Sequence, residues 1–168
     1  MPQKTSTSSP GAGILSEAQA AKRAEIVELL TRAYWMEAET VLSYLANAAN
    51  LDGIRAEEIA EALDEDVQEE LGHARQFARR IKDLYGTPPG TFDMVHEQAS
   101  LQPGDPTDVV SVIRGVIEAE AGAIDHYNRI IEACDGVDWA TQDMVIDILR
   151  DEENHLRTFE RYLAEFSS

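Results

Sequence analysis

The chain has 168 residues, a formal net charge of −18 and 43% hydrophobic residues. This length suits one domain with a single core, and the hydrophobic content argues against a largely disordered chain. With 32 acidic against 14 basic residues, it lacks the clustered positive charge on which nucleic-acid binding depends, so no nucleic-acid partner is expected.

The N-terminal stretch MPQKTSTSSPGAG lacks the apolar core of a secretory signal. We expect residues 1–15 to form a flexible tail and residues 16–168 to form the folded domain. No apolar run approaches the roughly 20 residues that cross a bilayer, so no membrane partner is expected. The single cysteine, Cys134, excludes an internal disulfide and fits a reducing compartment, and we therefore expect a cytoplasmic protein.

Apolar residues that recur at three- and four-residue spacing predict four long helices. The predicted helices cover about residues 16–50, 54–85, 107–134 and 138–168. Ser16 and Gln19 match a capping box at the start of the first helix. The breaks between helices coincide with Gly53, with Gly86 and the prolines that follow it, and with Gly136.

The lengths of the connections predict how these helices are arranged. The first and third connections are a few residues long, so each joins two antiparallel neighbours. The middle connection, about residues 86–106, can run the length of a ~30-residue helix at ~3.3 Å per residue. The second and third helices can therefore lie parallel. The sequence predicts an all-α four-helix bundle, made of two antiparallel hairpins joined by a long crossover.

Each predicted helix carries one glutamate where its apolar stripe calls for a hydrophobic residue. The four are Glu37, Glu70, Glu120 and Glu152. A buried carboxylate costs several kcal/mol unless it is paired or bound to a cation, so four of them need a common explanation. His73 and His155 follow the second and fourth of these glutamates by three residues, and therefore project from the same helical faces.

Charge balance supplies that explanation, because two divalent metal ions would neutralise four carboxylates. We predict a two-metal site formed by Glu37, Glu70, His73, Glu120, Glu152 and His155. Oxygen and imidazole ligands suit iron or manganese, although ligand type does not exclude zinc. One glutamate from each of two helices, with Glu-x-x-His from two others, is the known pattern of ferritin-like di-iron and di-manganese bundles.

An internal repeat supports this prediction. The pattern Glu-x-x-His-x-Arg-x-Phe-x-Arg begins at Glu70 and again at Glu152. In the other two helices a tyrosine follows the glutamate by seven residues, which pairs Glu37 with Tyr44 and Glu120 with Tyr127. Seven residues return nearly to the same helical face. The two halves therefore present matching sets of polar residues.

These residues resemble the ferritin-like superfamily over about Ala20 to Phe166, and most closely bacterioferritins and Dps-like proteins with a bacterioferritin-type site. The segment from Ala140 to His155 is especially similar to a bacterioferritin fourth helix. The resemblance implies ferroxidase chemistry, in which two Fe(II) ions per subunit bind and O2 or H2O2 takes their electrons. It also implies iron storage in a hollow homo-oligomeric shell and protection against oxidative stress.

The resemblance further implies a role for each residue. Glu37 and Glu120 would be terminal ligands of one metal each, Glu70 and Glu152 would bridge or lie between the metals, and His73 and His155 would each cap one. Tyr44 matches an aromatic residue beside the site that can donate an electron. Leu71 stands where bacterioferritins have their haem-ligating methionine, so no haem is expected. The chain stops shortly after its fourth helix, which favours a Dps-like dodecamer or a smaller assembly over a 24-subunit shell.

Two other functions stay open. A di-manganese or di-iron peroxidase or catalase would use the same ligands without storing a mineral, and a helical scaffold would keep only a vestigial metal site. For Tyr44 and Tyr127, a buried hydrogen bond is the structural alternative to a redox role. His126 lies about 240° around its helix from Glu120 and is predicted at the surface. His96 lies in the crossover, where a histidine is more often incidental than a ligand.

Overall fold

The computed structural model describes residues 13–166, which form four long helices, four short 3-10 helices and no strand. The long helices are α1 (Ala20–Asn50), α2 (Ile54–Asp83), α3 (Val109–Cys134) and α4 (Trp139–Phe166). The short helices are η1 (Gly13–Leu15), η2 (Glu17–Gln19), η3 (Thr91–Asp93) and η4 (Ala99–Leu101). The all-α prediction is confirmed. None of the helices within residues 13–166 combines the length and apolar character that crossing a membrane requires.

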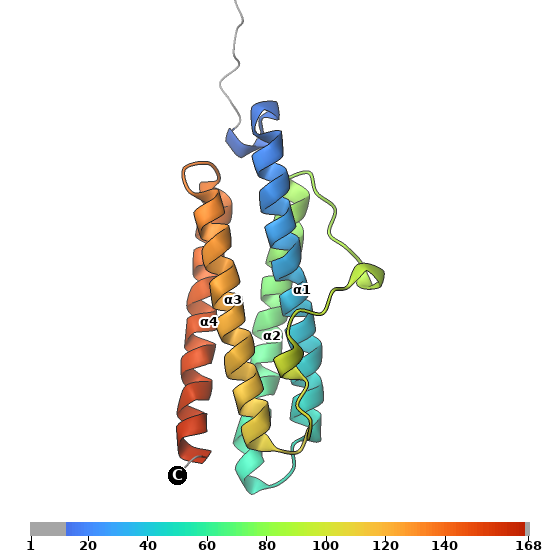
Figure 1. Ribbon diagram of the computed structural model, residues 1–168, viewed down its shortest axis with the longest axis vertical. Coiled ribbons are helices and arrows are strands. Elements are labelled where there is room, and N and C mark those ends of the chain that lie inside the picture. Colours follow the sequence, from blue (N-terminus) through green and yellow to red (C-terminus); the bar gives the residue numbers. More distant parts are fainter. Residues whose placement is uncertain (1–12, 167–168) are drawn as a thin grey trace, which may run out of the picture.

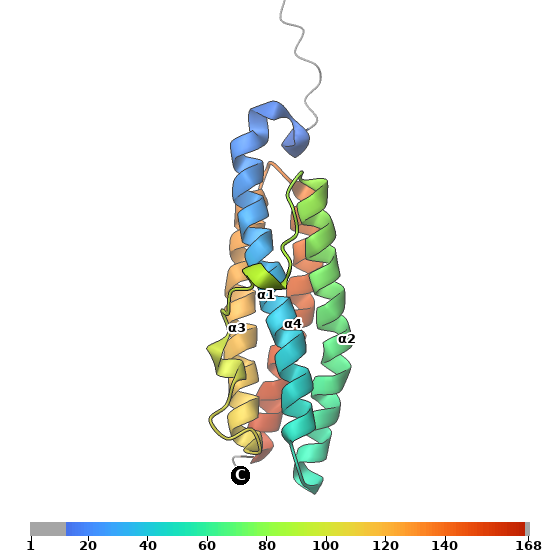
Figure 2. The same ribbon diagram turned by 90° about the vertical axis from the view of Figure 1, so that its right-hand side faces the viewer.

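The four long helices lie side by side in a bundle (Figure 1). α1 packs antiparallel to α2, and α3 packs antiparallel to α4. The crossover between α2 and α3 runs down the bundle alongside α1 and α3 (Figure 2), so α2 and α3 point in the same direction. The predicted arrangement of two hairpins and one long crossover is therefore confirmed.

The bundle core consists of two apolar clusters. The first contains Leu30, Phe77, Tyr127 and Ile148, one from each long helix. The second contains Tyr44, Leu63, Ile113 and Phe159, again one from each helix. On every long helix the predicted glutamate falls between its residues of the first cluster and those of the second. The bundle therefore holds a polar layer between two apolar ones.

The start of the bundle differs from the prediction. Ser16 forms no side-chain capping hydrogen bond, and α1 begins only at Ala20, so the predicted capping box is wrong. Arg23 instead donates hydrogen bonds to the main-chain oxygens of Ile14 and Ser16, which hold the preceding turns against α1. Ile14 is buried in the first apolar cluster. Of the predicted tail, residues 1–12 lie outside the described part of the chain.

Side chains of α1 hold the crossover in place. Gln98 donates hydrogen bonds to the Met36 carbonyl and the Thr40 hydroxyl, at 2.7 and 2.8 Å. Further along, the Asn47 amide donates to the Leu101 carbonyl at 3.1 Å. An irregular segment has few partners for its main-chain groups, and these side chains supply them. The crossover is thus part of the packed structure.

Close packing of the crossover on α3 leads to the first prediction. A Cβ atom added at Gly115 would lie 2.1 Å from the Ser100 carbonyl oxygen, which belongs to the main chain and has little freedom to shift. We expect Gly115→Ala to lower the free energy of unfolding by about 1–3 kcal/mol, as overpacking does elsewhere. Denaturant unfolding of the metal-free protein measures this change.

Gly122→Ala is the matched control, because a Cβ atom there meets nothing within 4 Å on the same helix. We expect it to raise the free energy of unfolding by about 0.5–1 kcal/mol, through the better helix propensity of alanine. A Gly115→Ala variant as stable as Gly122→Ala would show that the crossover does not pack closely on α3.

Candidate metal centre

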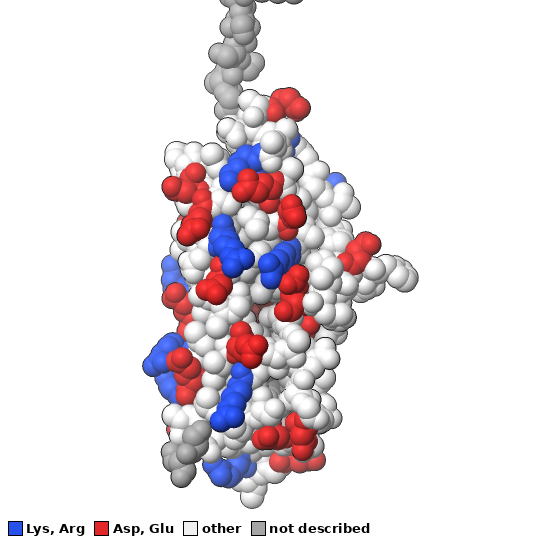
Figure 3. Space-filling view, viewed as in Figure 1, with Lys and Arg blue, Asp and Glu red and all other residues white. Residues whose placement is uncertain are grey.

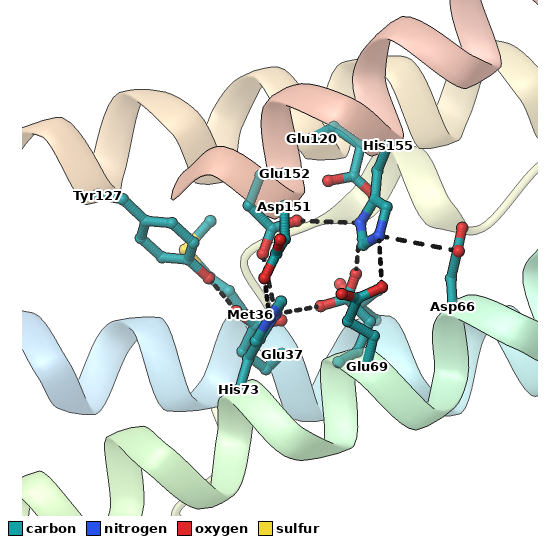
Figure 4. A network of polar contacts seen from close by, with 12 residues as sticks. Met36, Glu37, Asp66, Glu69, His73, Glu120, Tyr127, Asp151, Glu152 and His155 are labelled. Carbon is teal, nitrogen blue, oxygen red and sulfur yellow. Dashed lines mark hydrogen bonds and ion pairs between the residues drawn. The ribbon is translucent and has the colours of Figure 1, made fainter. Parts of the chain in front are cut away.

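The six predicted ligand residues come together, all buried, in the polar layer between the two apolar clusters. Figure 4 labels all of them except Glu70. Their possible ligand atoms form two groups, in each of which these atoms lie within 4.8 Å of one another. The first group is Glu37, Glu70, His73 and Glu152, and the second is Glu70, Glu120, Glu152 and His155. Glu70 and Glu152 belong to both groups. The arrangement offers two adjacent metal positions with two shared carboxylates.

The two shared carboxylates each face both histidines. Oε2 of Glu70 lies 3.2 Å from Nδ1 of His73, and Oε1 of Glu70 lies 3.2 Å from Nδ1 of His155. The two oxygens of Glu152 lie 3.2 Å from His73 Nδ1 and 3.4 Å from His155 Nδ1. Each carboxylate therefore presents one oxygen to each half of the centre, which is the geometry that a bridging ligand requires.

Glu37 and Glu120, which each belong to only one of the two groups, are each hydrogen-bonded to a tyrosine from the opposite hairpin. The Tyr44 hydroxyl on α1 donates to Glu120 on α3, and the Tyr127 hydroxyl on α3 donates to Glu37 on α1. Figure 4 shows Tyr127 pointing toward Glu37. Both tyrosines are fully buried. The seven-residue spacing in the sequence thus reflects hydrogen bonds between the two halves of the bundle.

An outer layer of acids contacts the far side of both imidazole rings, and two of its members, Asp151 and Glu69, were not predicted. Nε2 of His73 lies 3.3 Å from the Asp151 carboxylate, and Nε2 of His155 lies 3.2 Å from Glu69. Asp66 is 3.8 Å from the same nitrogen of His155. Carboxylates placed this way hold an imidazole so that its other nitrogen faces the metal. The sequence carries a signal for Glu69 and Asp151, because each directly precedes a Glu-x-x-His.

Electrostatics in the metal-free centre are governed by burial and by four close carboxylates. Burial, and then the charges of Glu70 and Glu152, raise the pKa of both Glu37 and Glu120 well above the usual range. Burial alone would also raise the pKa of Glu70, but close contacts with the His155 and His73 imidazoles together lower it. Protons therefore supply positive charge where metal ions would otherwise do so.

The two histidines carry part of that positive charge. Burial lowers their pKa values, but close contacts with the Glu152 and Glu70 carboxylates outweigh it and raise the pKa of His73 to about 10. The same groups raise the pKa of His155 to about 12. Both imidazoles are therefore protonated at neutral pH in the metal-free protein, and each must lose a proton before it can bind a metal.

Unsatisfied polar atoms indicate that the donor set fits metal ions. Glu70 Oε1, Glu152 Oε1 and His155 Nδ1 are buried, and their contacts with one another and with His73, at 3.2–3.4 Å, lack the alignment of a hydrogen bond. Such atoms are rare in folded proteins, because each costs about 1–3 kcal/mol. All three belong to the second ligand group. Their oxygen and imidazole chemistry suits divalent iron, manganese or zinc, and two such ions would balance the four carboxylates.

The burial of one histidine outside the centre differs from its prediction. His126, expected at the surface, is buried, and its Nε2 lies 2.9 Å from the Leu29 carbonyl of α1. The helical phase was correct, but α1 covers that side of α3, and burial lowers the pKa of His126. It lies outside both ligand groups. Cys134 is buried in the first apolar cluster.

Two named proteins are similar to the chain over most of its length. The chain is similar to the DNA protection during starvation protein of Pyrococcus furiosus, with 28% identity over 144 residues, covering 83% of this chain and 77% of the relative. It is also similar to a bacterioferritin of Desulfovibrio desulfuricans, with 25% identity over 140 residues, covering 83% and 74%.

A solved structure of ferritin-like, diiron-carboxylate proteins from Bacillus anthracis superposes on the chain with a TM-score of 0.73 and 25% identity. The superposition covers 84% of this chain and 97% of that one. The family model described as Ferritin-like domain matches residues 27–168. The chain therefore belongs to the ferritin-like domain family.

Proposed function

We propose that the protein is a ferroxidase, which oxidises Fe(II) with O2 or H2O2 at the buried centre and stores the product in an oligomeric shell. The observation that carries this proposal is the pair of ligand groups that share Glu70 and Glu152. Membership of the ferritin-like family and similarity to a diiron-carboxylate structure support it. Iron(II) is the substrate, and two bound ions together supply the two electrons that reduce O2 to H2O2, or H2O2 to water.

The side chains have distinct roles in this proposal. Glu37 and His73 hold one metal position, and Glu120 and His155 hold the other, with Glu70 and Glu152 between them. The apolar clusters on either side exclude water from the centre. The Tyr44 hydroxyl already donates to Glu120, so its proton has an acceptor, which supports Tyr44 as an electron donor beside the site. Tyr127 has the same relation to Glu37.

Iron titration tests the proposal. Under anaerobic conditions Fe(II) binding at the buried centre is expected to saturate near two ions per chain, and the aerated protein is expected to accumulate many more. Loading that stopped at two per chain would reject storage while leaving the centre intact. Consumption of peroxide without added Fe(II) would favour the peroxidase alternative. Metal content unchanged in a double variant, Glu37→Ala with Glu120→Ala, would favour the scaffold.

The outer acids give a further prediction. Because Asp151 and Glu69 orient the two imidazoles, we expect Asp151→Asn and Glu69→Gln each to weaken metal binding by about 10- to 100-fold. Glu153→Gln is the matched control, since Glu153 is exposed and adjacent to the ligand Glu152. Equilibrium dialysis with Co²⁺ measures the affinities. Equal affinity in Asp151→Asn, Glu69→Gln and Glu153→Gln would contradict the positioning role.

Exposed apolar side chains support assembly into a homo-oligomer. Leu42 and Leu45 of α1 are 61% and 46% exposed, and Leu42 lines an apolar groove between α1 and α2 together with Val41 and Leu71. A dodecamer of 18.6 kDa chains would have a mass of about 220 kDa. Light scattering at neutral pH measures it. A monomeric mass would contradict the shell.

The surface charge and the residues of the groove between α1 and α2 favour neither nucleic acid nor haem as a partner. On the face in Figure 3, acidic and basic side chains alternate without a broad basic patch. The net charge of −18 attracts cations such as Fe(II) and does not favour nucleic acid. Leu71 offers no thioether ligand to iron, so we expect no haem and no Soret band after incubation with hemin.

A further inference from the structure

A cavity of about 360 Å³ lies outside the bundle core, between α1 and the crossover. Its lining includes Glu39, Leu42, Asn47, Met94, His96 and Leu101. Glu39 and Glu37 are two positions apart on α1, about 200° around the helix at ~100° per residue, so they face in opposite directions. The cavity is therefore separate from the metal centre.

Glu39 is a buried carboxylate with one unsatisfied oxygen. Only 2% of the residue is exposed. Its Oε2 atom accepts hydrogen bonds from the main-chain N–H groups of Glu97 at 2.8 Å and Gln98 at 3.1 Å. Its Oε1 atom is buried and has no hydrogen-bond partner. A carboxylate oxygen buried in this way normally has a donor or a cation beside it.

His96 supplies a second potential ligand for such a cation. Its Nδ1 atom lies 3.5 Å from Glu39 Oε1, and its side chain is 69% exposed. Two protein ligands of one tetrahedral ion, each at about 2.0–2.2 Å, lie about 3.4 Å apart. The observed separation therefore matches two ligands of a single metal ion.

We propose that Glu39 Oε1 and His96 Nδ1 bind a third divalent metal ion per chain, of the class that accepts imidazole and carboxylate ligands, such as Zn²⁺. Water completes the coordination, because the cavity is open to solvent. Glu39 belongs to α1 and His96 to the crossover, so the ion fastens the crossover to the bundle. This site is independent of the ferroxidase proposal.

Zinc binding to the full-length protein tests the site. Wild-type protein is expected to bind one more Zn²⁺ per chain than His96→Ala, as measured by dialysis and elemental analysis. Glu39→Gln is expected to lose the same ion, because its amide oxygen can still accept the two N–H groups while Oε1 is replaced. Glu97→Gln is the matched control and should bind as many ions as wild type.

Limited proteolysis gives a second readout at the site itself. Cleavage within the crossover requires the crossover to detach from the bundle, and bound Zn²⁺ opposes this detachment. At a Zn²⁺ concentration ten times the dissociation constant, the cleavage rate of the wild type should therefore fall about tenfold. In His96→Ala, Zn²⁺ should leave the cleavage rate unchanged. Equal zinc content in wild type and His96→Ala, with equal cleavage rates, would overturn the proposal and identify the pair as a simple ion pair.

The two proposals fail in different ways. The zinc content of His96→Ala reports on the buried centre alone, and we expect about two ions per chain there. The difference between wild type and His96→Ala reports on the crossover site alone. A His96→Ala variant that bound no zinc would refute the buried centre. Equal zinc content in wild type and His96→Ala would refute only the crossover site.

Discussion

Glu70→Gln and Glu152→Gln are each expected to abolish binding of both metal ions, whereas Glu37→Gln and Glu120→Gln are each expected to remove only one. Glu70 and Glu152 belong to both ligand groups, while Glu37 and Glu120 belong to one each. Anaerobic titration with Co²⁺ should therefore give about zero ions per chain for the first pair of variants and about one for the second. These variants are made in a His96→Ala background, so that an ion bound at the crossover site is not counted.

The ferroxidase rate should fall with the lost ions. Changes to groups that only orient ligands already cost about 10- to 100-fold, so loss of a shared ligand is expected to cost at least about 100-fold. Glu118→Gln is the matched control, because it makes the same chemical change at an exposed position of α3. If Glu70→Gln and Glu37→Gln lost the same number of ions, the carboxylates would not be shared.

Metal binding at the centre is expected to weaken steeply as pH falls. The pKa of His73 is raised to about 10 and that of His155 to about 12, so both imidazoles bind a proton at pH 7 without metal. Two metal ions displace these protons, one at each position, and protons also leave Glu37 and Glu120, whose pKa values are raised as well. The overall constant for binding both ions should therefore rise by at least about 100-fold per pH unit near neutrality, since at least two protons are released.

Protonation of the two histidines weakens metal binding, but it stabilises the metal-free fold. A histidine whose pKa is raised by folding stabilises the protein most below its unfolded value of 6.5, and this contribution is lost as pH rises through about 10 to 12. Metal-free protein should thus become less stable at high pH, where metal binds most tightly.

Calorimetry with Zn²⁺ in two buffers of different ionisation enthalpy measures the proton release directly. The His96→Ala background restricts the measurement to the buried centre. An additional His155→Gln change should release about one proton fewer, because one imidazole no longer titrates. A binding enthalpy that did not depend on the buffer would contradict the protonated state of the two histidines.

The bundle and its six central residues could be predicted because they follow from helical periodicity. Glutamates such as Glu37 and Glu120 interrupt apolar stripes, and such an interruption is visible without any tertiary information. The lengths of the connections then predicted which helices pair as antiparallel hairpins and that α2 and α3 run parallel. The structure places all six side chains in one buried layer, although their role as metal ligands remains a proposal.

Other features depend on contacts that helical phase does not specify. The phase of His126 was correct, but only the fold shows that α1 covers it. Glu39 became buried because an irregular crossover packs over it, and crossovers have no periodicity from which contacts can be inferred. At Ser16 the local pattern suggested a helix cap. In the structure Arg23 donates a hydrogen bond to the Ser16 carbonyl, and α1 begins only at Ala20.

The most direct test of the central claim is anomalous scattering at the iron edge from crystals soaked anaerobically in Fe(II). We expect two neighbouring peaks in the polar layer, one beside Glu37 and His73 and the other beside Glu120 and His155. A single peak, or iron bound only at the protein surface, would contradict a dinuclear centre built on shared carboxylates.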